Sequence, residues 1–485
     1  MLILTYKLRS EWKTMVRISA ELKELAQIFK NNNKTLYIVG GFVRDSYLGI
    51  QSVLRDDIDL CSSVKPKELK KMLEGTKFEV KGINETVGVM AIFGKRRYEH
   101  ATFRKEIYES ESHMPDRIEF ISSLEEDARR RDFRINAIYY DILENTFIDP
   151  LSGIDDLKNK IITTVKVPKL VFNDDPERIL RLIRFACALG LSIPEEEMFY
   201  AKQNAYKVRF ISKYRLRAEF ERLLSADQIY PELLYTRDAH HRAMTLIGEL
   251  DIWKYILPAM DHMRQTSIKD KKGQNIYKHI LNCLLNASPK IRLAVLLHDT
   301  GKVKTMEIKQ NFFGSKEFSA TIIDKNLGVE GLGYPKATVN RVIKTVLGYD
   351  FNPWGFASTK TIKKFIFENK DVIDNVIEIK TVVKNENRSF GRRIRSAEKL
   401  RRVYNSMLQA GAPFDLRDLK VRGDDIIKEN PHINLENLDE LLDKLLLKAA
   451  INPRLNSKQT LLAEARKMIN SKRDYYLEDV KNFDY

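Results

Sequence analysis

The pattern of hydrophobic and polar positions changes character near residue 165. Before it, short apolar runs bounded by turns predict buried or half-buried strands. They lie at 36–39, 77–80, 87–93, 97–103 and 161–165, with amphipathic helices at 18–29 and 65–73. After Pro168 nearly every segment has the spacing of a helix. The pattern predicts an α+β fold, in which a small mixed-sheet head of five strands precedes an all-helical region.

This pattern and the motifs below divide the chain into four parts. We expect a head at 1–165, a neck and body at 166–276, a further helical domain at 277–395 and a tail at 396–485. The length of 485 residues suits several domains.

The composition points to a polyanionic partner and a reducing compartment. The formal net charge of +16 favours nucleic acid, although a lysine-rich coding bias gives the same charge. Three widely separated cysteines, Cys61, Cys187 and Cys283, show neither zinc-ligand nor disulfide spacing. The N-terminal apolar run is too short for a signal peptide, and no apolar stretch is long enough to span a membrane. We therefore expect a cytoplasmic protein without a membrane partner.

A glycine turn followed by paired carboxylates supplies the first candidate chemistry. Gly40 and Gly41 end the first apolar strand, where a backbone without Cβ atoms turns tightly and approaches a ligand. Asp57 and Asp59 follow, and residues two apart in a strand face the same side. Two adjacent carboxylates suit a hard cation such as Mg²⁺ and hence phosphoryl or nucleotidyl transfer. Taken alone, the pair more often marks a solvated strand end, but the glycine pair upstream and the motifs that follow favour the metal site.

Two later segments carry candidate nucleotide contacts. In 124–137 a helix begins with acidic residues and continues into Arg130, Arg131 and Asp132, which suit phosphate and ribose contacts or a solvated helix face. In 174–186 Pro176 opens a helix with arginines at every third position on one face. Glu99, on the strand at 97–103, is either a third metal ligand or an exposed strand residue.

In this order the motifs resemble the bacterial tRNA nucleotidyltransferase and poly(A) polymerase family, the class II branch of the DNA polymerase β-type superfamily. The match consists of GGFVRDSYLG with DID, then RRDFRINA at 130–137, then DDPER with LRLIRFA at 174–186. The resemblance implies a template-independent enzyme that adds CCA to the 3′ end of tRNA from CTP and ATP, with release of pyrophosphate.

The resemblance also implies roles for matching residues. Asp57 and Asp59 would be catalytic and hold Mg²⁺. Asp175 and Arg178 would read the base of the incoming nucleotide, because a carboxylate and a guanidinium complement the edges of C and A. The nucleotide-binding set is Gly40, Gly41, Arg44, Arg131, Asp132, Asn136, Asp175, Arg178, Arg181 and Arg184.

The chain departs from the family pattern at several positions. Asp174 stands where the family usually has Glu, Arg134 where it has Thr, and Glu111-Ser112-His113 where a loop commonly carries Asp-Gly-Arg. The family links that loop to the change from adding C to adding A. A poly(A) polymerase, or an enzyme that adds only CC or only A, is therefore the nearest alternative.

A second constellation lies in the region 277–302. His279 and the pair His298-Asp299 resemble the HD phosphohydrolase motif, which binds a divalent metal. Gly314-Ser315 occupies a segment where many HD domains have another histidine. The alternatives are a retained structural domain and a metal-dependent phosphohydrolase.

Basic helices complete the sequence. The helix at 214–224 could follow an acceptor stem or form a solvated helix face. The segment 419–447 resembles the family tail that meets the tRNA elbow. A cluster near 385–402 suits RNA phosphate contact or a solvated helix. Its main residues are Arg388, Arg392, Arg393 and Arg395. A non-catalytic RNA-binding protein is the third reading, and the paired aspartates argue against it.

Overall fold

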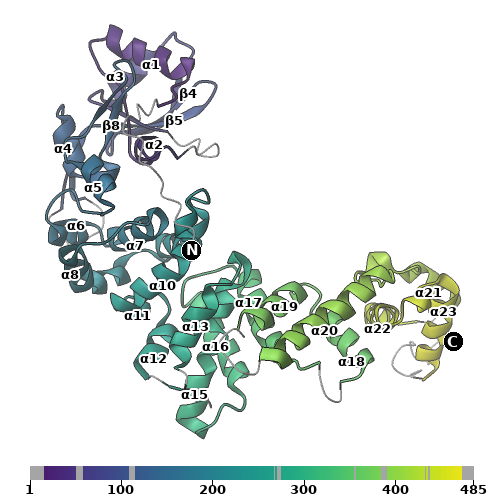
Figure 1. Ribbon diagram of the computed structural model, residues 1–485. Coiled ribbons are helices and arrows are strands. Elements are labelled where there is room, and N and C mark those ends of the chain that lie inside the picture. Colours follow the sequence, from purple (N-terminus) through teal and green to yellow (C-terminus); the bar gives the residue numbers. More distant parts are fainter. Residues whose placement is uncertain are drawn as a thin grey trace, which may run out of the picture. The chain divides into compact units, whose positions relative to one another are not determined.

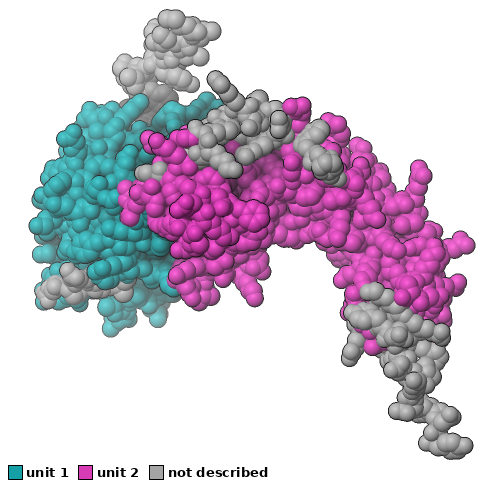
Figure 2. Space-filling model, turned by 90° about the horizontal axis from the view of Figure 1, so that it is seen from below, with its two compact units in different colours: residues 1–261 teal, residues 262–485 magenta. Residues whose placement is uncertain are grey.

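The computed structural model describes most of the chain. The described residues are 16–50, 58–108, 115–266, 268–269, 273, 275–353, 357–383, 390–431, 433–434 and 437–471. They form two compact units, residues 1–261 (unit 1) and residues 262–485 (unit 2), coloured separately in Figure 2. The finer division into four parts stays a prediction.

A mixed sheet of seven strands forms the framework of unit 1. Its order is β3-β4-β5-β2-β1-β8-β9. The strands are β1 (Tyr37–Val39), β2 (Asp59–Ser62), β3 (Glu79–Asn84), β4 (Val89–Phe93), β5 (Arg97–Thr102), β8 (Tyr139–Asp141) and β9 (Thr146–Ile148). Strands β2 and β5 are parallel, and the other neighbouring pairs are antiparallel. A separate hairpin joins β6 (Arg104–Ile107) to β7 (Arg117–Phe120).

The expectation of five strands was wrong. Strands β8 and β9 extend the sheet beyond β1, because the buried β8 pairs with the free edge of β1. The segment 161–165, which the sequence pattern predicts as a strand, makes only isolated bridges, Phe133 to Thr164 and Ile161 to Ser192.

Helices α1 (Ala20–Asn31) and α3 (Pro66–Leu73) pack together against the sheet (Figure 1). Helix α1 begins after Ser19, whose hydroxyl accepts a hydrogen bond from the backbone N–H of Leu22. Its apolar face buries Leu22, Leu25 and Phe29 completely. Burying three large side chains of this kind contributes roughly 1.5–3 kcal/mol each, which fixes α1 on the sheet.

The strand-to-helix turn after β1 leads directly into the functional region. Gly40 has φ +82°, a left-handed conformation that other residues rarely adopt, and it precedes α2 (Gly41–Tyr47). In β1 and β2, Val39 pairs with Asp59, so the start of α2 lies beside the start of β2. Helix α4 (Leu124–Arg129) ends before Arg130 and leaves the following arginines on a turn.

The rest of unit 1 is helical. It contains α5 (Gly153–Asn159), α6 (Pro168–Asp174), α7 (Glu177–Leu189), α8 (Glu195–Asn204), α9 (Lys213–Leu224), α10 (Ala239–Glu249) and α11 (Trp253–Ile256), and α12 (Pro258–Thr266) crosses into unit 2. Helix α7 is buried along most of its length and packs on α9 and α10.

Unit 2 is built from helices, as the sequence pattern predicts. They are α13 (Ile276–Leu284), α14 (Arg292–Leu297), α15 (Thr300–Lys309), α16 (Ser315–Leu327), α17 (Lys336–Tyr349), α18 (Thr359–Glu368), α19 (Ile373–Val382), α20 (Phe390–Gln409), α21 (Gly423–Glu429), α22 (Leu438–Ile451) and α23 (Lys458–Ser471). Within the described residues, none of the helices is both long and apolar enough to cross a membrane.

Candidate functional site

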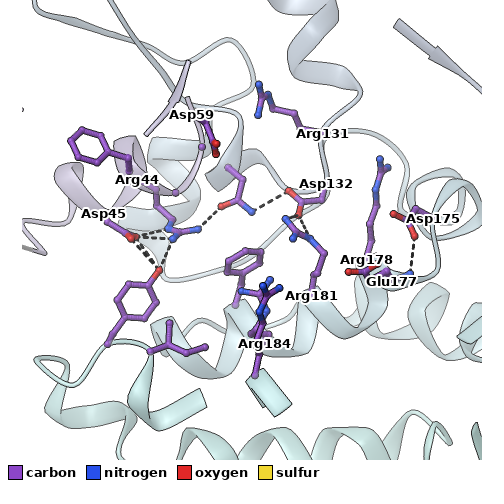
Figure 3. A pocket seen from close by; sticks show the side chains of 18 of the residues that line it. Arg44, Asp45, Asp59, Arg131, Asp132, Asp175, Glu177, Arg178, Arg181 and Arg184 are labelled. Atoms are coloured by element: carbon purple, nitrogen blue, oxygen red, sulfur yellow. Dashed lines mark hydrogen bonds and ion pairs between the residues drawn. The ribbon is translucent and has the colours of Figure 1, made fainter. Parts of the chain in front are cut away.

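A cavity of about 740 Å³ lies in unit 1 between the sheet and helix α7 (Figure 3). A volume of this size accommodates a small-molecule ligand. All ten residues that the sequence predicts for nucleotide binding line it, together with Asp59. The motifs, separated by more than a hundred residues of chain, therefore form one site.

The cavity is rich in charge of both signs. Its lining includes eight arginines, Arg44, Arg130, Arg131, Arg178, Arg181, Arg184, Arg215 and Arg222, and six carboxylates, Asp45, Asp59, Glu106, Asp132, Asp175 and Glu177. Several carboxylates pair with these arginines. The remaining positive charge suits an anionic ligand such as a nucleoside triphosphate.

One end of the cavity contains the carboxylate of Asp59. Its side chain is exposed, and in the parallel β2–β5 pair it stands directly beside Glu99. Cross-strand neighbours point to the same face of a sheet, so the two carboxylates are adjacent. Glu99 does not line the cavity and forms an ion pair with Arg97. Asp57, the partner predicted for Asp59, lies outside the described residues.

Arg44 and Asp45 form a buried network with side chains from distant segments. Arg44 is only 2% exposed and donates from Nε to Asp45 Oδ1 at 2.9 Å. Its two terminal nitrogens donate to Asn136 Oδ1 and to the hydroxyl of Tyr230. That hydroxyl in turn donates to Asp45 at 3.1 Å. Because its guanidinium is engaged on three sides, Arg44 fixes the start of helix α2 beneath the cavity.

Asp132 connects this network to helix α7. One of its oxygens accepts hydrogen bonds from Asn136 and from the backbone of Phe133, and the other accepts two from Arg181. Burial alone would raise the pKa of Asp132, but the charge of Arg181 and these hydrogen bonds lower it to about 2. Asp132 is therefore an ionised acceptor at neutral pH.

Arg130 and Arg131 are held by a carboxylate behind the cavity. Asp127, completely buried on α4, accepts from Arg130 Nε at 2.7 Å and from Arg131 Nη2 at 3.2 Å. The hydroxyl of Tyr139 donates to Asp127 and accepts from Arg131. Burial opposes ionisation of Asp127, but the charges of both arginines lower its pKa to about 2. The arginines are thus oriented before any ligand binds.

The opposite end of the cavity contains Asp175 and Arg178, on the far side from Asp59 in Figure 3. Arg178 is 7% exposed and donates from Nη2 to the backbone oxygen of Arg130 at 3.0 Å. Its buried Nη1 has no hydrogen-bond partner among the described residues. A buried, unsatisfied guanidinium nitrogen is costly, so a ligand acceptor at this position would stabilise the site.

Arg215 of helix α9 bridges two carboxylates at this end. Its Nη2 lies 3.5 Å from Asp175 Oδ2 and also pairs with Glu177. Asp174, which precedes Asp175, forms a different ion pair, 2.7 Å from Lys166 Nζ. The two neighbouring aspartates therefore have separate surroundings, and only Asp175 lines the cavity.

The sequence analysis missed Tyr230 and Glu177 as cavity residues, and it placed Arg215 on a helix that either contacts RNA or is solvated. Glu177 lies two residues after Asp175 in the third motif, so its position in that motif could have indicated it. Tyr230 follows a short 3₁₀ turn, η3 (Ala226–Gln228), and no motif marks it.

Unit 2 contains the second predicted constellation. His279, His298 and Asp299 offer ligand atoms within 4.8 Å of one another. His298 and Asp299 are buried, and Lys302 Nζ lies 2.5 Å from Asp299 Oδ2. A second ammonium, that of Lys316, is also buried, and burial lowers its pKa. These lysines supply positive charge where a metal would supply it.

The predicted RNA-binding arginines are only partly described. Arg388 lies outside the described residues. Arg392 and Arg393 are on helix α20, whose first side chains the structure does not describe, and Arg395 is exposed. The loop residues 111–113 also lie outside the described residues.

Comparison with known proteins identifies the N-terminal region. Residues 36–163 match the poly A polymerase head domain. This segment contains the glycine turn, Asp59 and the Arg131-Asp132 pair.

Three known proteins are similar over larger parts of the chain. The CCA-adding enzyme of Lactococcus lactis subsp. cremoris (strain MG1363) is 34% identical over 45% of this chain and 51% of its own length. The Bacillus stearothermophilus CCA-adding enzyme in complex with CTP has a TM-score of 0.64 at 22% identity, covering 94% of this chain and all of its own. The Thermotoga maritima CCA-adding enzyme complexed with tRNA has a TM-score of 0.56 at 19% identity, over 94% of this chain and 98% of its own.

The two kinds of similarity carry different information. In sequence, the chain matches about half the length of the curated relatives. In structure, the TM-scores of 0.64 and 0.56 over 94% of this chain show a shared fold, and at identities of 22% and 19% they show the fold alone.

Proposed function

We propose that this protein is a template-independent tRNA nucleotidyltransferase that adds CCA to the tRNA 3′ end from CTP and ATP. The observation that carries the proposal is the convergence of three motifs on one cavity, with carboxylates at one end and Asp175 and Arg178 at the other. Relatives with sequence similarity that are named CCA-adding enzymes support the choice of reaction.

In this reaction the 3′ oxygen of the RNA forms a bond to the α-phosphorus, and the bond to the β-phosphate oxygen breaks to release pyrophosphate. Asp132 accepts a ribose hydroxyl, and Arg131 contacts the phosphates. Asp175 accepts from the exocyclic amine that C and A share, and Arg178 donates to the adjacent ring acceptor. Neither G nor U offers that pattern, so their polar groups would be left unpaired.

We assign Mg²⁺ as the cofactor, held by Asp57 and Asp59. Asp59 is exposed at the cavity and offers carboxylate oxygens, the donor type that Mg²⁺ prefers. When bound, the metal lowers the pKa of the attacking hydroxyl and stabilises the departing pyrophosphate. Glu99 stands beside Asp59 and is proposed as a weaker, third ligand.

The nearest alternatives use the same site. A poly(A) polymerase would extend RNA with ATP alone and without a fixed length, and a partial enzyme would add only CC or only A. The test is extension of radiolabelled tRNA lacking its 3′ end, with Mg²⁺ and CTP, ATP or both. Addition of three nucleotides that then stops supports CCA addition, whereas a long A tail or a partial product selects an alternative. Absence of extension overturns the nucleotidyltransferase proposal.

The tail and the basic helices provide the proposed tRNA contacts. Arg395 is exposed on α20, and Arg388, Arg392 and Arg393 belong to the same basic segment. Contacts to phosphates are independent of sequence and weaken with salt. A tRNA substrate also places the protein in the cytoplasm.

A second candidate function is divalent metal binding by His279, His298 and Asp299, with phosphoester hydrolysis as its activity. The proximity of their ligand atoms favours it, and the ion pair of Lys302 with Asp299 competes with a metal. Titration with Mn²⁺ and Zn²⁺, monitored by calorimetry in wild type and His298→Gln, tests the site. Because the proposed Asp57–Asp59 site binds metal in both proteins, an additional binding event that only the wild type shows supports a metal centre at His298. Equal numbers of bound ions in both proteins would indicate that this region is structural.

A further inference from the structure

A basic, aromatic surface follows the nucleotide cavity in the chain. The sequence AYKVRFISKYRLRA at 205–218 contains five lysines and arginines, three aromatic residues and no carboxylate. It forms a 3₁₀ turn, η2 (Ala205–Phe210), and the first turns of α9. Its aromatic side chains are exposed, with Tyr206 at 39%, Phe210 at 44% and Tyr214 at 72%. Exposing apolar rings to water is unfavourable, so three exposed rings spaced four residues apart indicate a binding surface.

Guanidinium groups lie close to these rings. The Cζ atom of Arg209 is 4.7 Å from the ring centroid of Phe210 and 5.7 Å from that of Tyr206. The Cζ atom of Arg217 is 5.7 Å from the centroid of Tyr214. We call Tyr206, Arg209, Phe210, Tyr214 and Arg217 the aromatic–arginine patch. It combines flat, polarisable faces with fixed positive charge.

Two connections join the patch to the base end of the cavity. Tyr214 precedes Arg215, whose guanidinium lines the cavity and pairs with Asp175. The buried Lys207, within η2, donates to Asn173 Oδ1 at 2.6 Å, two residues before Asp175. The patch therefore borders the end of the cavity where the incoming base is read.

We propose that the aromatic–arginine patch binds the unpaired nucleotides at the 3′ end of the RNA that is extended. Unpaired bases stack on aromatic and guanidinium planes, and their phosphates pair with arginines. The absence of carboxylates between 205 and 218 favours a polyanion over a protein surface of mixed charge. The identity of this RNA as tRNA rests on the proposed function, whereas the binding of unpaired RNA does not.

The test is fluorescence anisotropy of labelled RNA with the full-length protein, without metal and without nucleotide. One hairpin has a three-nucleotide single-stranded 3′ extension and the other is blunt. We expect Tyr214→Ala to weaken binding of the extended hairpin about tenfold and to leave the blunt hairpin unchanged. Tyr214→Phe, which keeps the ring, should bind as the wild type does.

A matched control separates the patch from exposed tyrosines in general. Tyr235, on η4 (Leu234–Thr236), is 63% exposed and also has a lysine, Lys160, over its ring. Tyr235→Ala should leave both affinities unchanged. Both tyrosines are exposed, so neither substitution should change the melting temperature.

The outcomes distinguish the two proposals. If Tyr214→Ala binds the extended hairpin as tightly as wild type does, or loses affinity for both hairpins equally, the inference is overturned. Unchanged affinity for the extended hairpin would instead favour a protein as the partner of the patch. Failure of tRNA extension in the wild type overturns the proposed function alone, because this binding assay requires no catalysis. A 4-thiouridine at the RNA 3′ end, crosslinked by light, should modify residues within 205–218.

Discussion

The hydroxyl of Tyr230 accepts a hydrogen bond from Arg44, although the two residues are 186 positions apart in the chain. The same hydroxyl donates to Asp45, the neighbour of Arg44, at 3.1 Å. Tyr230 thereby connects helix α2, which follows the glycine turn, to the segment after η3. The centroid of the Phe185 ring on α7 lies 5.1 Å from the Cζ atom of Arg44, so α7 also contacts this guanidinium.

Removal of this hydroxyl should loosen the cavity. Tyr230→Phe leaves part of a buried guanidinium and carboxylate unsatisfied, which costs about 1–3 kcal/mol. We expect a lower free energy of unfolding in urea and a raised KM for CTP. Tyr235→Phe, at an exposed tyrosine, is the control and should change neither quantity. An unaltered KM in a destabilised Tyr230→Phe protein would show that the network stabilises the fold without positioning the site.

Substitutions at the adjacent carboxylates Asp59 and Glu99 should separate their contributions to catalysis. Asp59→Asn keeps the shape of the side chain and removes its charge. We expect kcat for CTP addition to fall by at least about 10³-fold, because a transfer site that loses a metal ligand loses stabilisation of the transition state. Glu99→Gln should reduce kcat by less than about tenfold, since Glu99 does not line the cavity. Equal losses would make Glu99 a full metal ligand. Titration of kcat with Mg²⁺ provides the measurement, because loss of a ligand raises the metal concentration required.

Asp175 should control which nucleotide is added. Asp175→Asn replaces an acceptor by a group that also donates, so discrimination against UTP should fall by about 1–3 kcal/mol, or roughly tenfold to a hundredfold. The ratio of kcat/KM for CTP to that for UTP measures it. Asp174→Asn is the matched control, because Asp174 pairs with Lys166 and does not line the cavity. A similar change of the ratio in both variants would argue against base reading by Asp175.

Glu197 on helix α8 should make stability depend on pH. Its Oε1 accepts from the N–H and hydroxyl of Thr164, and the next residue, Val165, donates to the backbone oxygen of Asp132. Burial raises the pKa of Glu197 from the ordinary 4.5 to about 7. A folded-state pKa above the unfolded value means that the contribution to stability is complete below pH 4.5 and is lost as the pH rises through 7.

The loss between pH 5 and pH 8 should be roughly 2–3 kcal/mol, since one pKa unit corresponds to about 1.4 kcal/mol and part of the titration lies below pH 5. Glu197→Gln imitates the protonated acid and should be more stable than wild type at pH 8 and equal to it at pH 5. Urea denaturation at both pH values measures this. Glu196→Gln, at the exposed neighbour, should behave as wild type does. A wild-type protein equally stable at both pH values would contradict the expected titration.

The order of strands and helices was only partly predictable. The change from strand to helix patterning near residue 165, the glycine turn and the helices at 18–29 and 65–73 were all predicted from the sequence. Strands β8 and β9 were not predicted. They are strands because β1 offers a free edge for β8, which is a property of the assembled sheet.

The chemistry of the candidate site divides in the same way. The sequence by itself determined the local spacings, such as the arginines at every third position of α7 that share one helix face. Only the tertiary structure decided their partners: Tyr230 for Arg44, Asp132 for Arg181, and Arg215 for Asp175. The physical reason is that helix and strand periods depend on neighbouring residues, whereas a buried charge must find its partner wherever packing places one.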